Sequence, residues 1–247
     1  MEFDVATWTR LAALAGGGLC MGFGAIGAAV GEGLAAAQAN GAVSRNPALA
    51  GDIFKTMLVG QAVAESAAIF ALVVAMLLLF SDFSHGSWLD VSVVFSAGIC
   101  MGFGAIGSGV GSGFPAGAAC EGMARQPQAS GRLMTNMLIG SAVCQTPAIF
   151  AMVVSFILLF TNFSGRPVNP TWAALLGAGL ASGIAAIGPG IGGGLVAQTS
   201  CYGVARNPDR AGPVTNVMLL GQAVTQTTAI YGMLVSFILM FKGMPEA

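Results

Sequence analysis

The residues of this 247-residue chain best suited to chemistry are polar side chains set inside long apolar stretches. Glu65 lies in an apolar run from Ile53 to Phe80, with Gln61 one helical turn before it and Ser66 directly after it. A carboxylate at the centre of a membrane span costs roughly 2.5–3.5 kcal/mol, so such residues are usually functional. A carboxylate, a hydroxyl, a side-chain amide and a backbone carbonyl together suit a dehydrated sodium ion, whereas a protonated acid needs only one or two partners.

Glu32 is a second acid, set deep in the preceding glycine-rich apolar run. It lies 14 residues before Asn46 (46 − 32), and Glu65 lies 19 residues after Asn46 (65 − 46). At about 1.5 Å per helical residue, both acids fall near the middle of a membrane. Two acids at one depth favour a functional site. The alternative for Glu32 is a protonated acid that donates a hydrogen bond to a neighbouring helix.

The composition places the chain in lipid. It is 55% hydrophobic and 8% charged, with a mean hydropathy of +0.82, whereas a soluble domain is about 25% charged. The net charge of −1 gives no basis for nucleic-acid binding. Five cysteines lie in apolar segments without CxxC spacing, which indicates buried thiols and supports no disulfide framework, zinc site or other cofactor.

The chain consists of one unit repeated three times. The segment from Cys20 to Gly27 returns unchanged from Cys100 to Gly107, and a looser copy runs from Ser182 to Gly188. An Arg-x-Pro motif marks each copy, with offsets of 80 (125 − 45) and 81 (206 − 125) between successive arginines, which are Arg45, Arg125 and Arg206. We therefore expect three hairpin repeats, at residues 1–81, 82–162 and 163–247.

Each repeat holds two apolar runs long enough to cross roughly 30 Å of hydrocarbon. The predicted fold class is therefore an all-α integral membrane protein with six transmembrane helices, in three tandem antiparallel hairpins. The proline of each Arg-x-Pro motif separates the two helices of its hairpin, because proline lacks an N–H and restricts its predecessor. The predicted helices cover residues 8–41, 52–80, 88–121, 131–161, 171–203 and 212–241.

The two helices of each hairpin differ in bulk. The first is rich in glycine, and pairs four residues apart such as Gly27 and Gly31 make a flat stripe on which another backbone can pack closely. We expect the first helices to form a tightly curved inner ring. The second helices carry large apolar side chains and are expected to face lipid.

Basic residues set the expected orientation. Six lie in or beside the turns within the hairpins and three lie on the opposite side, which predicts a multi-pass cell-membrane protein with cytoplasmic Arg-x-Pro loops and outside termini. The six are Arg45, Lys55, Arg125, Arg132, Arg206 and Arg210, and the three are Arg10, Arg166 and Lys242.

The acid at position 65 is not repeated. Gln145 and Gln226 stand at its place in the second and third repeats. The hydroxyl that follows the acid does persist, which favours a liganded cation, although a hydroxyl can also bond back to its own helix. The three hydroxyl residues are Ser66, Thr146 and Thr227.

The glycine-rich first helix, the Arg45-Asn46-Pro47 loop and the segment from Gly60 to Phe70 together resemble the c subunit, or proteolipid, of rotary ATPases. The resemblance covers essentially the whole chain, three times over. It implies a homo-oligomeric ring in the lipid bilayer, which turns against a stator a-type subunit whose essential arginine displaces the ion. It also implies that central-stalk subunits dock on the loops at Arg45, Arg125 and Arg206, and that the ring has no catalytic site of its own.

Within that family the chain is most similar to the sodium-type members. These carry a Glu-Ser or Glu-Thr pair on the outer helix, as in Glu65-Ser66, and a Gln or Glu on the inner helix, as in Glu32. A backbone carbonyl at the position of Val63 completes their ion site. Together with Gln61, these residues form the ligand set that we expect here.

In this family a site lies between adjacent hairpins, with the inner-helix ligand supplied by the neighbour. The resemblance then implies that Glu65 faces Ser112 or Gly193, which replace Glu32 in the other repeats. We hypothesise that Glu32 faces a glutamine of another hairpin, so that an acid–amide pair makes a second ion site. The candidate partners of that second site are Gln145, Thr146, Gln226 and Thr227.

The predicted function is that of a rotor-ring subunit, which binds and translocates a cation at Glu65 in a rotary ATPase. Sodium is favoured over the proton. Fewer than one ion site per hairpin leaves more free energy of ATP hydrolysis for each ion, which favours a pump. The alternative is a largely structural ring or pore proteolipid, which the glutamines at two acid positions favour. A membrane enzyme has no support in the sequence, because we find no nucleophile–base pair, metal cluster or phosphate loop.

Overall fold

The computed structural model describes residues 4–163 and 172–242, and these residues are helical apart from short connectors. Six stretches are long and apolar enough to cross a membrane, which confirms the predicted fold class. Hairpin 1 consists of α1 (Val5–Arg45) and α2 (Ala50–Phe80), and hairpin 2 of α3 (Trp88–Arg125), α4 (Ser130–Cys144) and α5 (Thr146–Phe160). Hairpin 3 consists of α6 (Trp172–Arg206) and α7 (Ala211–Lys242).

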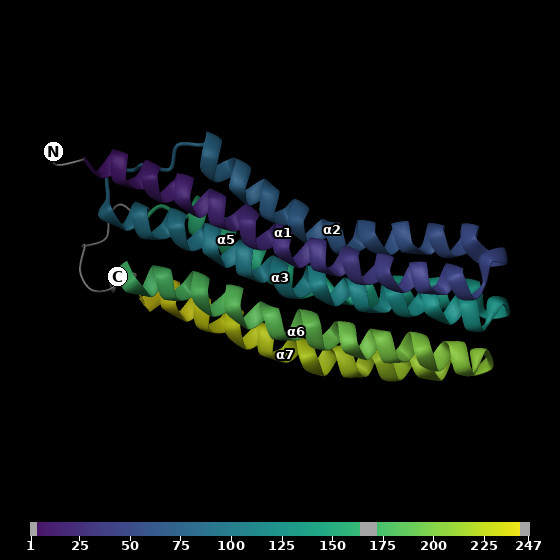
Figure 1. Cartoon of the computed structure of the whole chain (residues 1–247). Helices are drawn as coiled ribbons and strands as arrows, with labels where there is room; N and C mark the ends of the chain where they lie inside the picture. Colours follow the sequence, from purple (N-terminus) through teal and green to yellow (C-terminus); the bar gives the residue numbers. More distant parts are fainter. Residues whose placement is uncertain (1–3, 164–171, 243–247) are drawn as a thin grey trace.

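The hairpins lie side by side, with the turns inside the hairpins at one end and the described chain ends at the other (Figure 1). The first helices form one row, because α3 packs against both α1 and α6. The second helices pack against their own first helices and expose many large apolar side chains, as expected for a lipid-facing layer. Each turn is a short 3₁₀ helix that begins at the proline of the Arg-x-Pro motif: Pro47–Leu49, Pro127–Ala129 and Pro208–Arg210.

Glycine allows the first helices to pack backbone against backbone. A Cβ on Gly27 would come within 2.6 Å of the Cα of Ile106. A Cβ on Gly31 would collide with the carbonyl of Gly109, and a Cβ on Gly111 with the carbonyl of Gly190. The expected glycine stripe between the first helices is therefore confirmed.

At the two ends of the row of first helices, glycines at equivalent positions have no helix packed against them. Gly102 in α3 packs against the backbone of α1, but its counterpart Gly22 in α1 has no atom within 4 Å of an added Cβ. Gly107 in α3 packs against the backbone of α6, but its counterpart Gly188 in α6 has no such neighbour either. The outer edges of hairpins 1 and 3 thus carry the two complementary halves of the interface that joins the hairpins within the chain.

One predicted helix is broken. The stretch expected at residues 131–161 divides at Gln145 into α4 and α5, because Pro147 has no N–H to donate to the carbonyl of Val143. The Gln145 N–H instead bonds to the carbonyl of Ala142 at 3.1 Å. The Ala148 N–H bonds to the hydroxyl of Ser108 in α3 at 3.2 Å. The break falls at the acid position of hairpin 2.

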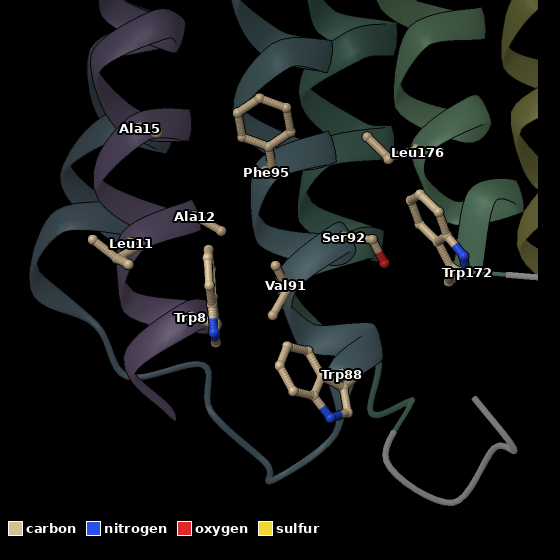
Figure 2. A pocket seen from close by; sticks show the side chains of 10 residues that line it. All are labelled: Trp8, Leu11, Ala12, Ala15, Trp88, Val91, Ser92, Phe95, Trp172 and Leu176. Atoms are coloured by element: carbon tan, nitrogen blue, oxygen red, sulfur yellow. The ribbon is translucent and has the colours of Figure 1, made fainter. Parts of the chain in front are cut away.

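The two ends of the bundle differ in chemistry. At the turn end, Glu121 forms ion pairs with Arg45 at 3.4 Å and with Arg125 at 2.5 Å. At the other end, three indoles lie on the first turns of the three first helices and line an apolar groove of about 580 Å³ (Figure 2). They are Trp8, Trp88 and Trp172. Indoles at this level are typical of a membrane–water interface. Arg166, which was counted on this side, lies outside the described residues.

Candidate ion-binding site

The mid-span polar positions are held in place by a bond between the helices of each hairpin. Gln61 donates from Nε2 to the main-chain carbonyl of Glu32 at 3.2 Å. In the other hairpins, Ser141 donates to the carbonyl of Ser112 at 3.3 Å, and Gln222 to that of Gly193 at 3.0 Å. The bond fixes the depth of the second helix relative to the first. Gln61, predicted as an ion ligand, therefore has its amide engaged in positioning the two helices.

Glu65 and Glu32 are neighbours on hairpin 1. Gln61, one helical turn before Glu65, donates to the main-chain carbonyl of Glu32, which places the two acids at the same level of the hairpin. Glu65 is exposed and Glu32 is half-buried. Within the described residues, hairpin 1 lies at one end of the row, and the acid position of α2 is exposed at that edge.

Gln145 occupies the same position in hairpin 2 but is only 6% exposed. Its Nε2 donates to the carbonyl of Val63 on hairpin 1 at 2.9 Å and to the hydroxyl of Ser112 on its own hairpin at 2.6 Å. The carbonyl of Ser108 lies 3.5 Å from the same nitrogen. Ser66 donates to the carbonyl of Val63 at 2.7 Å, so Val63 and Ser66 both belong to the boundary between hairpins 1 and 2.

Gln226 repeats this arrangement in hairpin 3 with fewer partners. It is 7% exposed, and its Nε2 donates to the carbonyl of Val143 on hairpin 2 at 3.3 Å. Gly193, which stands at the position of Ser112, offers no side chain. The carbonyl of Val143 is free to accept because Pro147 cannot donate to it.

Two expectations about this site are wrong. Gln145 takes its inner-helix partner, Ser112, from its own hairpin, and its partner on the neighbouring hairpin is the carbonyl of Val63 on a second helix. The hypothesis that Glu32 pairs with Gln145 or Gln226 also fails within this chain. Over the described ranges, the amide nitrogens of both glutamines bond to other groups.

The predicted ligand set is therefore divided between two places. Glu65 and Glu32 lie together on hairpin 1, while Val63 and Ser66 face Gln145. Thr227 bonds to the carbonyl of Val224 at 2.7 Å, as Ser66 does to Val63. The sequence reasoning missed Ser108 and Ser112 as partners of Gln145. A hydroxyl at the inner-helix position was the available signal for Ser112.

Three tandem hairpins with a polar group at mid-span in each define a multi-pass membrane protein built by repetition of one unit. The model of the ATP synthase c-subunit family matches the chain three times, at residues 15–78, 95–158 and 176–239. The chain belongs to this family. Its members are non-catalytic ring subunits of rotary ATPases.

Individual relatives match one repeat length. The ATP synthase c subunit numbered 1 from Syntrophotalea carbinolica is 46% identical over 70 residues, which are 28% of this chain and 80% of that protein. The ATP synthase c subunit from Clostridium beijerinckii is 50% identical over 66 residues, which are 27% of this chain and 92% of that protein. The ATP synthase c subunit from Geotalea uraniireducens is 46% identical over 69 residues, or 28% of this chain and 76% of that protein. The chain is therefore a c-type unit in triplicate.

Proposed function

We propose that this rotor-ring protein carries one cation at Glu65, on the free edge of hairpin 1, and that sodium is preferred over the proton. The observation that carries the proposal is the contrast at one repeated position: Glu65 is an exposed acid, whereas Gln145 and Gln226 are buried amides. An exchangeable ion needs a group that changes charge and can be reached from outside. Only Glu65 among the three meets both conditions.

The ring closes head to tail between copies of this chain. The open glycines of α1 and α6 support this arrangement, because their counterparts inside the chain are buried against a neighbouring first helix. Exposed apolar residues support it too: Ile26 is 54% exposed, whereas its counterparts Ile106 and Ile187 are half-buried. A head-to-tail contact that uses two different edges generates a ring when the rotation closes.

The neighbouring copy completes the ion site. Gln145 contacts Val63, 82 residues earlier, and Gln226 contacts Val143, 83 residues earlier. The same relation applied to hairpin 1 pairs Glu65 with Val224 of an adjacent copy, on hairpin 3. Val224 is 71% exposed in the single chain, which is consistent with a partner there. The proposed ligands are thus the carboxylates of Glu65 and Glu32, with the Val224 carbonyl and the Thr227 hydroxyl of the next copy.

The donor set favours sodium. Two carboxylates, a carbonyl and a hydroxyl give several oxygens around one point, which a dehydrated hard cation requires. Two adjacent carboxylates repel each other when both are ionised, and a bound cation removes that repulsion. A proton needs one or two partners, so a proton ring is the alternative that the experiment below distinguishes.

The remaining partners follow from the family and from charge. The Arg45, Arg125 and Arg206 loops gather at one end of the bundle, which supports cytoplasmic loops that contact the central stalk and termini on the outside (Figure 1). The arginine of the stator a-type subunit would meet Glu65 as the ring turns. One ion site for three hairpins favours a pump, because the free energy of each ATP hydrolysed is divided among fewer ions.

The test is dicyclohexylcarbodiimide labelling of the purified ring at mildly acidic pH, with and without sodium chloride, read by mass spectrometry residue by residue. The reagent attacks a protonated membrane carboxyl. Labelling of Glu65 that sodium suppresses supports a sodium ring. Labelling that ignores sodium and falls only with rising pH would make this a proton ring. An unlabelled Glu65 would contradict ion carriage and favour a structural ring component.

A further inference from the structure

We infer that the boundary between hairpins 1 and 2 is a latent cation site, in which the amide nitrogen of Gln145 takes the place of the ion. The inference rests on the proposed function, because it concerns how two of the three boundaries are kept from carrying the ion of Glu65. It predicts that one substitution, Gln145→Glu, converts this boundary into a working site.

The evidence is the convergence of oxygens on one nitrogen. The Val63 carbonyl, the Ser112 hydroxyl and the Ser108 carbonyl lie 2.9, 2.6 and 3.5 Å from Nε2 of Gln145. They come from two helices in two hairpins, α2 and α3, and Gln145 is 6% exposed. An amide nitrogen has two hydrogens for these three acceptors. Several neutral oxygens that converge on one buried point form the surroundings that proteins offer to a hard cation.

The other end of the amide is unmatched. Among the residues that the structure describes, Oε1 of Gln145 is buried without a hydrogen-bond partner, as are Oε1 of Gln222 and Oε1 of Gln226. A buried acceptor without a donor is unfavourable, so the hydrogen-bonding needs of the Gln145 side chain itself do not explain its place here. The nitrogen, by contrast, satisfies the oxygens around it. The amide nitrogen of Gln145 therefore interacts with the surrounding oxygens as a bound cation would.

The amide also fixes the charge of the boundary. The amide is neutral at every pH and, unlike a bound ion, it cannot leave the site. The boundary therefore passes the stator without binding or releasing an ion. A carboxylate at position 145 would instead set negative oxygens against the Val63, Ser112 and Ser108 oxygens. That arrangement requires a proton or a metal cation between them.

Gln226 provides a matched control. It is equally buried, at 7% exposed, and stands at the equivalent position in hairpin 3. Over the described part of the chain, its Nε2 has one acceptor, the Val143 carbonyl at 3.3 Å, and Gly193 stands in place of Ser112. Gln226→Glu therefore makes the same chemical change at the same depth with fewer oxygens to bind an ion.

The experiment compares assembled rings of the unchanged chain, Gln145→Glu, Gln226→Glu and Gln145→Glu with Ser112→Ala. Carbodiimide adducts are counted at each position across a series of pH values and sodium chloride concentrations. We expect the number of carboxyls with the sodium and pH response of Glu65 to rise from one to two per chain in Gln145→Glu alone. Loss of the Ser112 hydroxyl should remove that response at position 145, and Gln226→Glu should not acquire it.

A second measurement applies if the carbodiimide does not reach the carboxyl introduced at position 145. The melting temperature of the Gln145→Glu ring should fall at alkaline pH without sodium and recover on adding sodium or acid, by more than in the Gln226→Glu ring. Equal responses of the two variants in both measurements would overturn the latent site. Failure of Glu65 in the unchanged ring to respond to sodium or pH would instead overturn the proposed function, so the two failures are distinguishable.

Discussion

Gln145 of hairpin 2 donates a hydrogen bond from its amide nitrogen to the carbonyl of Val63 on hairpin 1, at 2.9 Å. This bond crosses a hairpin boundary, and a similar bond joins Gln226 to Val143 at the next one. The acid position of each of these hairpins thus faces a valine carbonyl of the preceding hairpin. In the proposed ring, the hairpin before Glu65 belongs to another copy of the chain, so the surroundings of Glu65 depend on assembly.

Glu65→Gln should abolish ATP-driven cation transport and preserve the ring. The substitution is close in shape, and the new amide can bond to a valine carbonyl as Gln145 and Gln226 do. We expect transport by the reconstituted complex to fall to background, with the melting temperature of the ring unchanged or higher. Cation uptake into proteoliposomes and the thermal melt of the ring measure the two effects. A variant that still transports would show that Glu65 is not the carrier.

Thr227→Ala and Ser66→Ala should differ, although both residues follow the acid position of a hairpin. Thr227 is proposed to complete the Glu65 site across the junction between copies, whereas Ser66 lies at the Gln145 boundary. Loss of one oxygen ligand corresponds to about a tenfold change in affinity, or ~1.4 kcal/mol. We expect the sodium concentration that half-protects Glu65 from carbodiimide to rise about tenfold in Thr227→Ala and to stay within about twofold in Ser66→Ala. The reverse order would assign Ser66 to the Glu65 site.

Gly22→Leu and Gly102→Leu should separate ring assembly from folding. Gly22 lies on the open edge of α1 with no neighbour for an added Cβ, and Gly102 lies at the equivalent place in α3, where a Cβ would come within 3.1 Å of Cys20. We expect Gly22→Leu to prevent ring formation with little change in the fold of the chain. Gly102→Leu should destabilise the chain itself by about 1–3 kcal/mol or more, because it overpacks a closed interface.

Native mass spectrometry reports the oligomer, and thermal melting of the detergent-solubilised chain reports the fold. An intact ring in Gly22→Leu would show that α1 does not form the junction between copies.

Glu32→Gln should change how sodium binding depends on pH and leave Glu65 reactive. The proposed site holds two neighbouring carboxyls, so sodium competes with protons at both. With Gln at position 32, a single carboxyl remains to be deprotonated. We expect fewer protons to be released per sodium bound, which calorimetry in buffers of different ionisation enthalpy measures. An unchanged proton count would show that Glu32 stays outside the site.

The hairpins could be predicted from sequence because repetition, apolar run length and the Arg-x-Pro turns all report local structure. The observed helices exceed several predicted ends by a few residues: α1 ends at Arg45 rather than residue 41, because the proline that stops it comes only at position 47. The break at Gln145 follows from Pro147, which the prediction of one helix at residues 131–161 did not take into account.

The partners of the acid position could not be predicted in the same way. The rotation of each helix about its own axis decides whether Gln145 meets Ser112 of its own hairpin or a residue of its neighbour. Sequence spacing fixes depth along the membrane but not that rotation. The depth prediction for Glu32 and Glu65 agrees with their adjacency in hairpin 1, whereas the predicted grouping of Val63 and Ser66 with Glu65 was wrong within the chain.

The most direct test of the central claim is a high-resolution density map of the assembled ring, determined in sodium at neutral pH. We predict one ion peak per chain, between Glu65 and Glu32 of one copy and the Val224 carbonyl and Thr227 hydroxyl of the next, with Gln145 and Gln226 bonded as in the single chain. An ion peak beside Gln145, or a Glu65 that faces lipid without Val224 as its neighbour, would contradict it.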